Sequence, residues 1–310
     1  MTLGRMDLHL IARDGIFSTA DAARVGLDRN ALKRLVRDGR CLRLTTGWYA
    51  VVVDQTPGRE ELHRLRSLAL GRQLRARAAL SHHSCLVVAG LPTFAADLDT
   101  VHLTAVVPSV GGVSVARRGV SVHRRVGGLT APSPDTLATD SPRLVPIAWA
   151  AVQAGLVSGP EAFVVPADAA LRSGRATSAE LSRAADVFAS HTGIGLVRAA
   201  LSIVDARHES PGESRTAFVL TALGYELEVQ VEIVVQGRLY RPDFRIRGTR
   251  VLVEFDGAVK YDNRRALFEE KQREDALRRA GWVVVRLVWA DLADPQRVSH
   301  RVRAALSLVA

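Results

Sequence analysis

Acidic residues in the last third of the chain have the types and spacing of a divalent-metal site. Asp243 follows Pro242, and Glu254 and Asp256 follow at the end of an apolar run. Antiparallel pairing of two strands would bring these carboxylates side by side. Hard cations such as Mg²⁺ prefer oxygen ligands and keep several waters. An ion held there could polarise a phosphate oxygen and activate a water molecule, which predicts phosphodiester hydrolysis.

The segments around these carboxylates are expected to form a sheet flanked by helices. A helix that starts near Pro211 carries Glu213 and ends at Gly224, a normal residue at a helix end. Alternating apolar patterns predict strands at Leu227 to Val235, Tyr240 to Ile246 and Arg250 to Phe255. A helix from about Arg265 to Ala280 and a last strand from Trp282 to Trp289 complete the expected domain.

The order of these residues resembles the PD-(D/E)XK nuclease superfamily, and within it the DUF559 proteins and the very short patch repair endonucleases. The supporting string runs from Arg241 to Trp289. The resemblance implies a restriction-endonuclease-like fold and Mg²⁺ or Mn²⁺ as the cofactor. It implies that Asp243 is the central metal ligand, that Glu254 and Asp256 are further ligands or water-positioning groups, and that Glu213 is an orienting partner.

The sequence departs from these families at the position of the general base. Asp256 stands where the superfamily usually has lysine, and the patch repair enzymes carry histidines where Asp256 and Tyr261 stand. Lys260 is the candidate replacement for the basic catalytic residue, and the identity of the base stays open. Candidates for support of the site are Tyr261, Lys271 and Asp275. A turn would explain Asp256-Gly257 if it stood alone.

The beginning of the chain predicts a winged helix-turn-helix. An amphipathic helix is expected from Leu3 to Arg13, and Ser18 and Thr19 are candidate N-caps of a short second helix. Gly26 supplies a turn, and Asp28 caps a third helix from Arg29 to about Asp38. The alternating segment from Cys41 to Val53 predicts a hairpin that would serve as the wing.

The third helix and the hairpin carry basic and hydrogen-bonding residues suited to DNA. They are expected to share an exposed face of a size that enters a DNA groove. The predicted DNA-binding residues are Arg29, Asn30, Lys33, Arg34 and Arg37 on the helix and Arg43 in the hairpin. Winged helices also serve as protein-docking or structural modules, and an ordinary solvated helix carries similar charges.

The middle of the chain predicts an α+β module without catalytic spacing. Its one chemical feature is the pair His82-His83, flanked by Ser81 and Ser84. Adjacent residues of a helix point about 100° apart, and no third histidine lies in local register. The pair is therefore better explained as the start of a helix than as a metal site.

The first two-thirds of the chain resembles the AbiEi family of type IV antitoxins. The resemblance implies DNA binding, autoregulation of a promoter and a cognate toxin or another protein as a partner. It rests on the winged-helix segment Phe17 to Tyr49, on Ser81-His82-His83-Ser84 running into Gly90-Leu91-Pro92, on Val101-His102-Leu103-Thr104, and on Ala167-Asp168-Ala169-Ala170-Leu171.

The bulk properties of the 310 residues agree with a folded, multidomain α+β or α/β protein. Hydrophobic residues make up 47% and charged residues 24%, which excludes a disordered chain. Three domains are predicted: residues 1–55, a winged helix-turn-helix; residues 56–195, an α+β module; and residues 196–310, an endonuclease-like domain with a mixed central sheet. The formal charge of +10 favours a polyanionic partner.

Other function classes find no support in the sequence. The two cysteines have no CxxC spacing, which argues against a zinc ribbon or a disulfide scaffold. No signal peptide or membrane span is recognisable, so a cytoplasmic location is expected. A P-loop or a Gly-rich dinucleotide fingerprint is absent from the sequence, so no nucleotide cofactor is expected.

Two hypotheses therefore stand beside each other. In the first, the winged helix brings a metal-dependent nuclease to DNA, and Asp243, Glu254 and Asp256 hold the metal. In the second, the protein is a DNA-binding repressor or antitoxin without catalysis, and its nuclease-like fold binds nucleic acid or a partner. The complete set of carboxylates favours the first.

Overall fold

The computed structural model describes residues 8–53, 55–107, 115–117, 119–130, 140–257 and 264–309, with the backbone alone at 115–117 and 264–271. The chain divides into two compact units. The N-terminal unit comprises Met1–Leu91 and Ala95–Ala154, and the C-terminal unit comprises Pro92–Phe94 and Gly155–Ala310. The finer division into three domains at residues 55 and 195 stays a prediction.

The N-terminal unit begins with two short helices joined by a tight turn. Ser18 caps α1 (Thr19–Arg24): its hydroxyl accepts a hydrogen bond from the Asp21 N–H, and the Asp21 side chain accepts one from the Ser18 N–H. Gly26 adopts a left-handed φ of +79° in the turn. The Asp28 side chain then caps α2 (Arg29–Arg37). These caps confirm the predicted helix starts.

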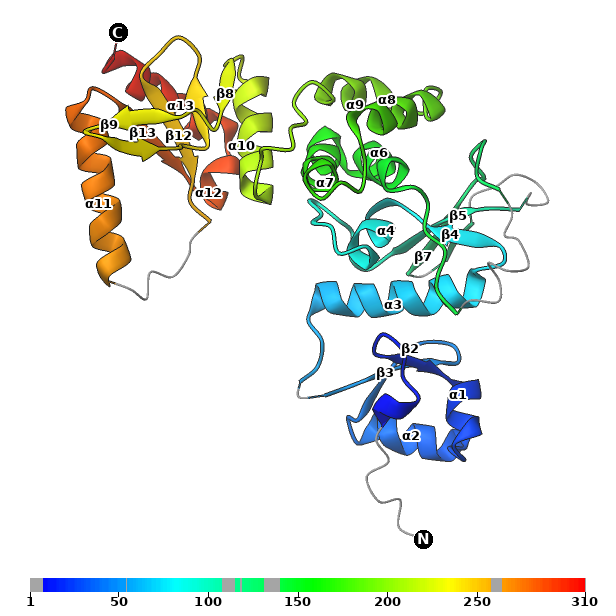
Figure 1. The fold of residues 1–310 in the computed structure, drawn as a ribbon. Coiled ribbons are helices and arrows are strands. Elements are labelled where there is room, and N and C mark those ends of the chain that lie inside the picture. Colours follow the sequence, from blue (N-terminus) through cyan, green and yellow to red (C-terminus); the bar gives the residue numbers. More distant parts are fainter. Residues whose placement is uncertain are drawn as a thin grey trace. The chain divides into compact units, whose positions relative to one another are not determined.

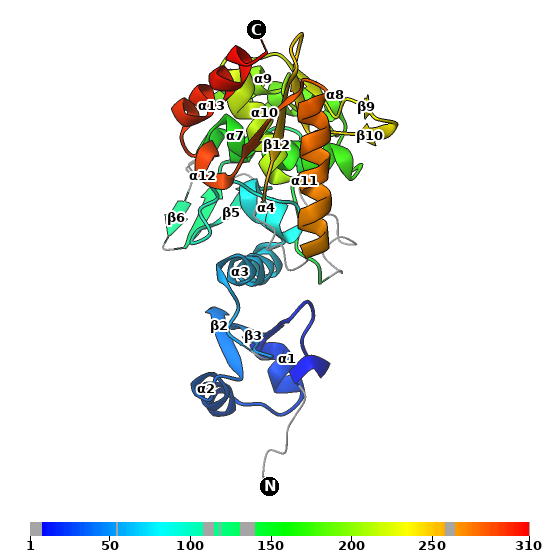
Figure 2. The same cartoon turned by 90° about the vertical axis from the view of Figure 1, so that its left-hand side faces the viewer.

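A three-stranded sheet lies between these helices and the next one, as both Figure 1 and Figure 2 show. The sheet is antiparallel with the order β1-β3-β2, formed by β1 (Ile16–Ser18), β2 (Cys41–Thr45) and β3 (Trp48–Val51). Phe17 and Leu32 are buried on the side of α1 and α2. Ile16 and Leu68 are buried on the other side, where α3 (Arg59–Leu74) packs.

The second sheet of the N-terminal unit brings together strands that are distant in the sequence. Its order is β4-β5-β7-β6, and only the β5–β7 pair is parallel. Helix α4 (His82–Val88) follows β4 directly and contacts β5. The strands are β4 (Ala78–Leu80), β5 (Val101–Ala105), β6 (Val115–Arg117) and β7 (Val120–His123), and α6 (Ile147–Ser158) follows them in the chain.

The C-terminal unit starts with helices that lead into its sheet. They are α7 (Pro160–Arg172), α8 (Ser178–Val187), α9 (Ile194–Ala200) and α10 (Pro211–Ala222). The fully buried Asp168 of α7 accepts hydrogen bonds from the Asp205 N–H at 2.8 Å and from His208 Nδ1 at 2.7 Å. Arg215 of α10 pairs with Glu161 of α7, with Nε 2.6 Å from Oε1. These buried contacts fix α10 against α7.

The C-terminal sheet is mixed and has the order β13-β12-β11-β8. Strands β12 and β13 are parallel and are connected through α11 (Arg264–Arg279), whereas the other neighbours are antiparallel. Strands β9 and β10 form a separate hairpin. The bounds are β8 (Leu227–Val229), β9 (Ile233–Val235), β10 (Arg238–Tyr240), β11 (Phe244–Ile246), β12 (Val251–Phe255) and β13 (Val283–Leu287).

Helices cover both faces of this sheet, so its central strand is buried on both sides. Val251 and Val253 of β12 face a core that contains residues of α10, α12 (Trp289–Leu292) and α13 (Pro295–Ser307). Leu252 faces the opposite core, which contains Leu277 of α11 and residues of the β9–β10 hairpin. Figure 1 shows α10 and α11 on opposite sides of the sheet. The predicted mixed sheet flanked by helices is the observed architecture of this unit.

Three predicted elements differ from the structure. Of the helix expected from Leu3 to Arg13, the described part contains only a 3-10 turn (Leu8–Leu10), because the chain reverses at Asp14 and Gly15, both with left-handed φ. The strand expected from Leu227 to Val235 is split into β8 and β9. The strand expected from Tyr240 to Ile246 is interrupted between β10 and β11, where Pro242 removes a donor from the ladder.

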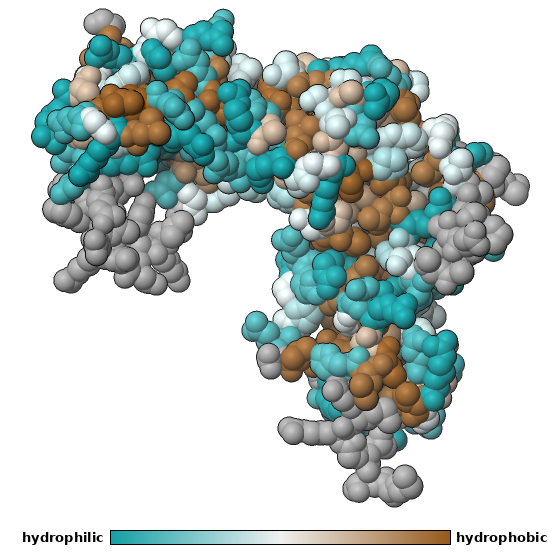
Figure 3. Space-filling view, viewed as in Figure 1, coloured by the Kyte–Doolittle hydropathy of each residue, from teal (hydrophilic) through white to brown (hydrophobic). Residues whose placement is uncertain are grey.

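None of the helices in the described part of the chain is long and apolar enough to cross a bilayer. In the face shown in Figure 3, hydrophilic residues cover much of the C-terminal unit, and a hydrophobic patch lies over the β9–β10 hairpin. Val234 and Leu239 are exposed apolar side chains of this hairpin.

The close approach of α10 to β12 yields a test of the fold. A Cβ atom at Gly212 would lie 1.9 Å from Cε1 of Phe255, so the Gly212→Ala protein must shift the helix or the ring. We expect a loss of about 1–3 kcal/mol in the free energy of unfolding, measured by urea denaturation. The control is Gly195→Ala on α9, where a Cβ would have open space and should stabilise by up to about 1 kcal/mol. Equal stability of the two variants would contradict the close packing.

Candidate functional site

The first candidate site is the exposed side of α2. The helix buries Ala31, Leu32 and Leu35, and Val36 packs against the same core, so its polar residues face solvent. All five predicted DNA-binding residues of the helix are exposed: Arg29, Asn30, Lys33, Arg34 and Arg37. The Nε atom of Arg37 lies 3.2 Å from Oδ1 of Asp38. Arg29, Lys33 and Arg34 make no ion pair with any residue that the structure describes, so their charges are available to an anion.

The wing lies next to this helix in the chain. Strands β2 and β3 form a hairpin with Gly47 in a left-handed conformation at its turn. The register shifts between Arg43 and Thr45, which marks a β-bulge. Arg43 is exposed, as the sequence predicts. The structure therefore places all the predicted DNA-binding residues at the surface of the N-terminal module.

The second candidate site lies at the end of β12, where the predicted carboxylates stand. Asp243 immediately precedes β11, and Glu254 lies on β12. Because Phe244 pairs with Val253 in antiparallel register, Asp243 falls beside Glu254. The Phe255 N–H donates to Oδ2 of Asp243 at 2.7 Å. The strand pairing that the sequence predicts therefore brings these two carboxylates to the same end of the sheet.

Helix α10 adds Glu213 to this group. The Ser210 hydroxyl caps the helix by accepting from the Glu213 N–H, and Oε2 of Glu213 accepts from the Glu209 N–H at 2.8 Å. Only 9% of Glu213 is exposed. Its negative charge is close enough to Asp243 to raise the pKa of that carboxyl. The predicted helix-borne acid thus lies in the electrostatic field of the predicted central ligand.

Asp243 has a strongly perturbed pKa. Burial, together with the negative charges of Glu213 and Glu254, raises the pKa of its carboxyl to about 7. The Phe255 hydrogen bond and the Arg273 guanidinium oppose this rise. A carboxyl that changes its charge near neutral pH can hold or release a proton there, or bind a cation that offsets the repulsion.

Arginines that the sequence interpretation did not assign to the site neutralise Glu254. Arg273 of α11 lies 2.6 Å from Oε1 of Glu254, measured from Nη2. Arg286, which pairs with Glu254 across β12 and β13, lies 3.9 Å from Oε2, measured from Nε. The alternating sequence of β13 predicts a strand that contains Arg286. The register of this strand with β12 depends on the crossover through α11, so the sequence alone does not pair Arg286 with Glu254. A metal ion at Glu254 would compete with these guanidinium groups.

The remaining predicted site residues are less closely connected. Asp256 is half-buried after the end of β12, where its N–H donates to the Leu287 carbonyl at 2.8 Å. Asp275 lies on α11 with its carboxylate 3.9 Å from Arg278. Lys260 and Tyr261, and the side chain of Lys271, lie outside the described residues. The assignment of a metal to Asp243, Glu254 and Asp256 stays a prediction.

Histidines form the group with the geometry of a metal site. Within the described residues, His82, His102 and His123 are the one set of at least three His, Cys, Asp or Glu side chains whose donor atoms all lie within 4.8 Å of one another. The partners of His82 are distant from it in the sequence. His102 and His123 come from β5 and β7, and no spacing rule connects them to a helix that precedes both strands.

Known proteins resemble this chain in separate ways. Residues 6–52 match the family model described as "Transcriptional regulator, AbiEi antitoxin". Two relatives, the uncharacterized proteins MT2308 and Rv2248 from two strains of Mycobacterium tuberculosis, are each 29% identical over 282 residues. The match covers 89% of this chain and 96% of each relative.

A solved structure also matches part of the chain. It is the catalytic domain of the homing endonuclease I-Bth0305I, at 18% identity and a TM-score of 0.25. The match covers 30% of this chain and 89% of that domain. The match to the AbiEi antitoxin model, at residues 6–52, lies on the winged-helix module.

The raised pKa of Asp243 predicts a pH-dependent stability. The folded chain keeps the Asp243 proton at pH values where the unfolded chain has released it, so stability falls as the pH rises from about 4 to about 7. We expect Asp243→Asn, which carries no charge, to gain stability relative to the parent by roughly 1 kcal/mol per pH unit over this window. Urea unfolding between about pH 4 and about pH 8 measures the difference.

The control for this series is Glu226→Gln, which removes one exposed carboxylate. Its effect at each pH gives the contribution of a single surface charge. The free energy of unfolding of each variant is compared with that of the parent protein at each pH. If the difference for Asp243→Asn equals the difference for Glu226→Gln at every pH, the pKa of Asp243 is not raised.

Proposed function

We propose that this protein is a DNA-binding transcriptional regulator whose helix α2 enters the major groove of duplex DNA. The observation that carries the proposal is the exposed basic face of α2, behind which the apolar residues of the same helix are buried. The match of residues 6–52 to a transcriptional-regulator model supports it. A helix-turn-helix places the second helix in the groove and the wing over the backbone.

The residues of α2 divide by the chemistry they offer to DNA. Arg29 and Asn30 stand at the N-terminal end of the helix, which faces base edges in helix-turn-helix complexes. Arginine suits guanine and asparagine suits adenine, because each offers two hydrogen bonds to its base. Lys33, Arg34 and the wing residue Arg43 suit phosphates. Arg37 would have to break its ion pair with Asp38 before it could contact a phosphate.

The antitoxin description of the matched family extends the proposal to regulation in a toxin–antitoxin pair. In this role the protein would bind the promoter of its own gene, and a cognate toxin would be its protein partner. The winged-helix module supplies the DNA contacts, which leaves the larger C-terminal unit for the partner.

Substitutions on α2 test the DNA interface. We expect Lys33→Ala and Arg34→Ala each to weaken binding to duplexes of any sequence and to lower the slope of log affinity against log salt by about 1, because each removes one phosphate contact. Asn30→Ala should instead relax the preference at one base pair by about 1–3 kcal/mol. Fluorescence anisotropy with a random duplex and with DNA from upstream of the coding sequence measures both effects.

The matched control for this test is Arg198→Ala, which removes an exposed arginine from α9 in the C-terminal unit. Its affinity and salt slope should equal those of the parent protein. If Lys33→Ala and Arg34→Ala also equal the parent, α2 does not contact DNA and the winged helix serves another purpose.

The carboxylates at the end of β12 favour a second candidate function, a divalent-metal-dependent nuclease. The specific observation is the β11–β12 register, which places the carboxylate of Asp243 beside that of Glu254. Burial and the charges of Glu213 and Glu254 raise the pKa of Asp243 to about 7. The oxygen donors of Asp243, Glu254 and Asp256 fit Mg²⁺ or Mn²⁺ chemically. The ion would supply charge stabilisation at a phosphate and a more acidic water. Glu254 would have to release its ion pair with Arg273 in order to bind the metal ion.

Asp243→Ala distinguishes this nuclease from the regulator. If the carboxylates are catalytic, we expect Asp243→Ala to lose metal-dependent cleavage of supercoiled plasmid and of a labelled single strand, by about a hundredfold or more, with DNA affinity unchanged. Glu226→Ala, at an exposed carboxylate on the same unit, should cut like the parent protein. Absence of cutting by the parent protein on both substrates, with DNA binding intact, would leave the regulator as the function.

A further inference from the structure

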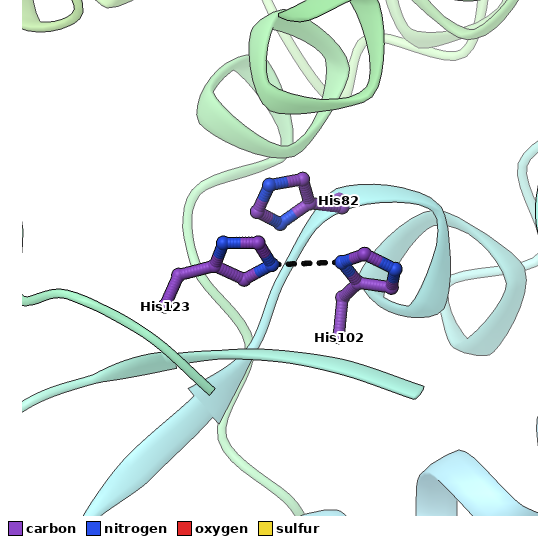
Figure 4. Close-up of side chains that lie close together, drawn as sticks. All are labelled: His82, His102 and His123. Atoms are coloured by element: carbon purple, nitrogen blue, oxygen red, sulfur yellow. Dashed lines mark hydrogen bonds between the residues drawn. The ribbon is translucent and has the colours of Figure 1, made fainter. Parts of the chain in front are cut away.

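Three histidine rings converge in the interior of the N-terminal unit. His82 stands at the start of α4, His102 lies on β5, and His123 lies on β7. Nδ1 of His102 is 2.8 Å from Nε2 of His123, and the rings of His82 and His123 are stacked with centroids 4.0 Å apart. Figure 4 shows the three rings facing one another beside the strands. His82 and His102 are buried, and His123 is half-buried.

The backbone around the rings holds them in place. In the parallel pair β5–β7, His102 is opposite Ser121 and His123 is opposite Thr104, so both histidines lie on the same face of the sheet. The Ser81 N–H donates to the His102 carbonyl at 3.0 Å, which ties the start of α4 to β5. His82 has a left-handed φ of +52°, a conformation that costs free energy in a residue other than glycine.

Each of the three histidines contributes one ring nitrogen to the group, and these nitrogen atoms all lie within 4.8 Å of one another. Nδ1 of His82 is 2.9 Å from the Ser81 hydroxyl. A hydrogen bond at one ring nitrogen fixes the tautomer and orients the other nitrogen toward a metal. At the 2.8 Å contact between His102 and His123, a single proton joins two nitrogen atoms. A cation coordinated by both can replace that proton.

The surroundings keep the imidazoles in the form that binds metals. Burial lowers the pKa of His102 to about 3 and also lowers the pKa of His123, which favours the neutral form of both rings. The carboxylate of Asp97 lies close enough to His102 to favour a positive charge there. A bound cation would thus have imidazole nitrogen donors and a nearby negative group.

Neighbouring histidines show how this chain buries an imidazole for packing alone. Nδ1 of His63 is 3.0 Å from the Leu98 carbonyl, and its Nε2 is 3.0 Å from the Ser84 hydroxyl. Nε2 of His83 is 3.3 Å from the Thr100 carbonyl. His82 and His123 also contact hydroxyl oxygens, of Ser81 and Ser121. The difference is that His82, His102 and His123 bring ring nitrogens within 4.8 Å of one another.

We propose that His82, His102 and His123 bind one divalent transition-metal ion of the zinc type. Three imidazoles suit Zn²⁺, which takes four ligands in a tetrahedron, and a water molecule or a hydroxyl group fills the fourth position. The ion fastens the start of α4 to β5 and β7 and stabilises this part of the fold. The site lies in a different unit from Asp243 and holds whether or not either proposed function is correct.

The test uses the full chain without an affinity tag, stripped with a chelator and titrated with ZnCl₂. We expect one zinc per chain by elemental analysis and a higher unfolding temperature with zinc, because the ion binds the folded state. His123→Asn should weaken zinc binding by about a hundredfold or more. The matched control His83→Asn removes an adjacent buried imidazole that bonds to Thr100, and it should bind zinc like the parent protein.

X-ray absorption of the zinc-loaded parent protein gives a result that needs no variant. Three imidazole nitrogens at about 2.0–2.1 Å and no sulfur are expected. A sulfur ligand, which would implicate Cys41 or Cys85, overturns the proposal. So does zinc at no more than trace levels after titration, or His123→Asn protein that is folded by circular dichroism and binds zinc with the parent affinity.

Discussion

The buried Asp168 carboxylate is the interaction on which the C-terminal unit depends. It accepts from the Asp205 N–H and from His208, and both partners lie in the segment that leads into α10. A buried charge without partners would destabilise the fold by several kcal/mol, so this segment has to keep its path. The path sets the cap at Ser210, and the cap sets the position of Glu213 beside Asp243. The acidic group at the end of the sheet is therefore held from a helix outside it.

Both candidate sites in the interior place ionisable groups where the fold gains little stability from them. The carboxyl of Asp243 is held near two other acids, and the backbone of His82 adopts a strained conformation. Such costs persist where the surrounding structure imposes them, and they are concentrated at sites that bind or react. The exposed basic face of α2 is different in kind, because its charges remain in water and become useful only when an anion arrives.

Local signals made the N-terminal module predictable, and long-range pairing limited the rest. Ser18, Gly26 and Asp28 act within one turn of helix, so their types alone indicate where α1 and α2 begin. The alternation from Leu227 to Val235 does not reveal that β8 joins the main sheet while β9 joins a hairpin, because both strands carry apolar residues at alternate positions. The Glu254–Arg273 pair and the convergence of His82, His102 and His123 depend on contacts between segments that the sequence alone does not place together.

The parallel pairing of β12 with β13 has a consequence for the order of folding during synthesis. Strands β8, β11 and β12, which pair antiparallel and carry the Asp243–Phe255 hydrogen bond, leave the ribosome before α11 and β13. At that stage Leu252 is not yet covered by Leu277, and one edge of β12 is not yet paired with β13. Crossover connections of this kind form late, because a long loop must close before its contacts form. A nascent chain whose β12 has emerged while β13 is still inside the ribosome would therefore expose an apolar strand edge, which makes this interval the one in which a chaperone would be most useful.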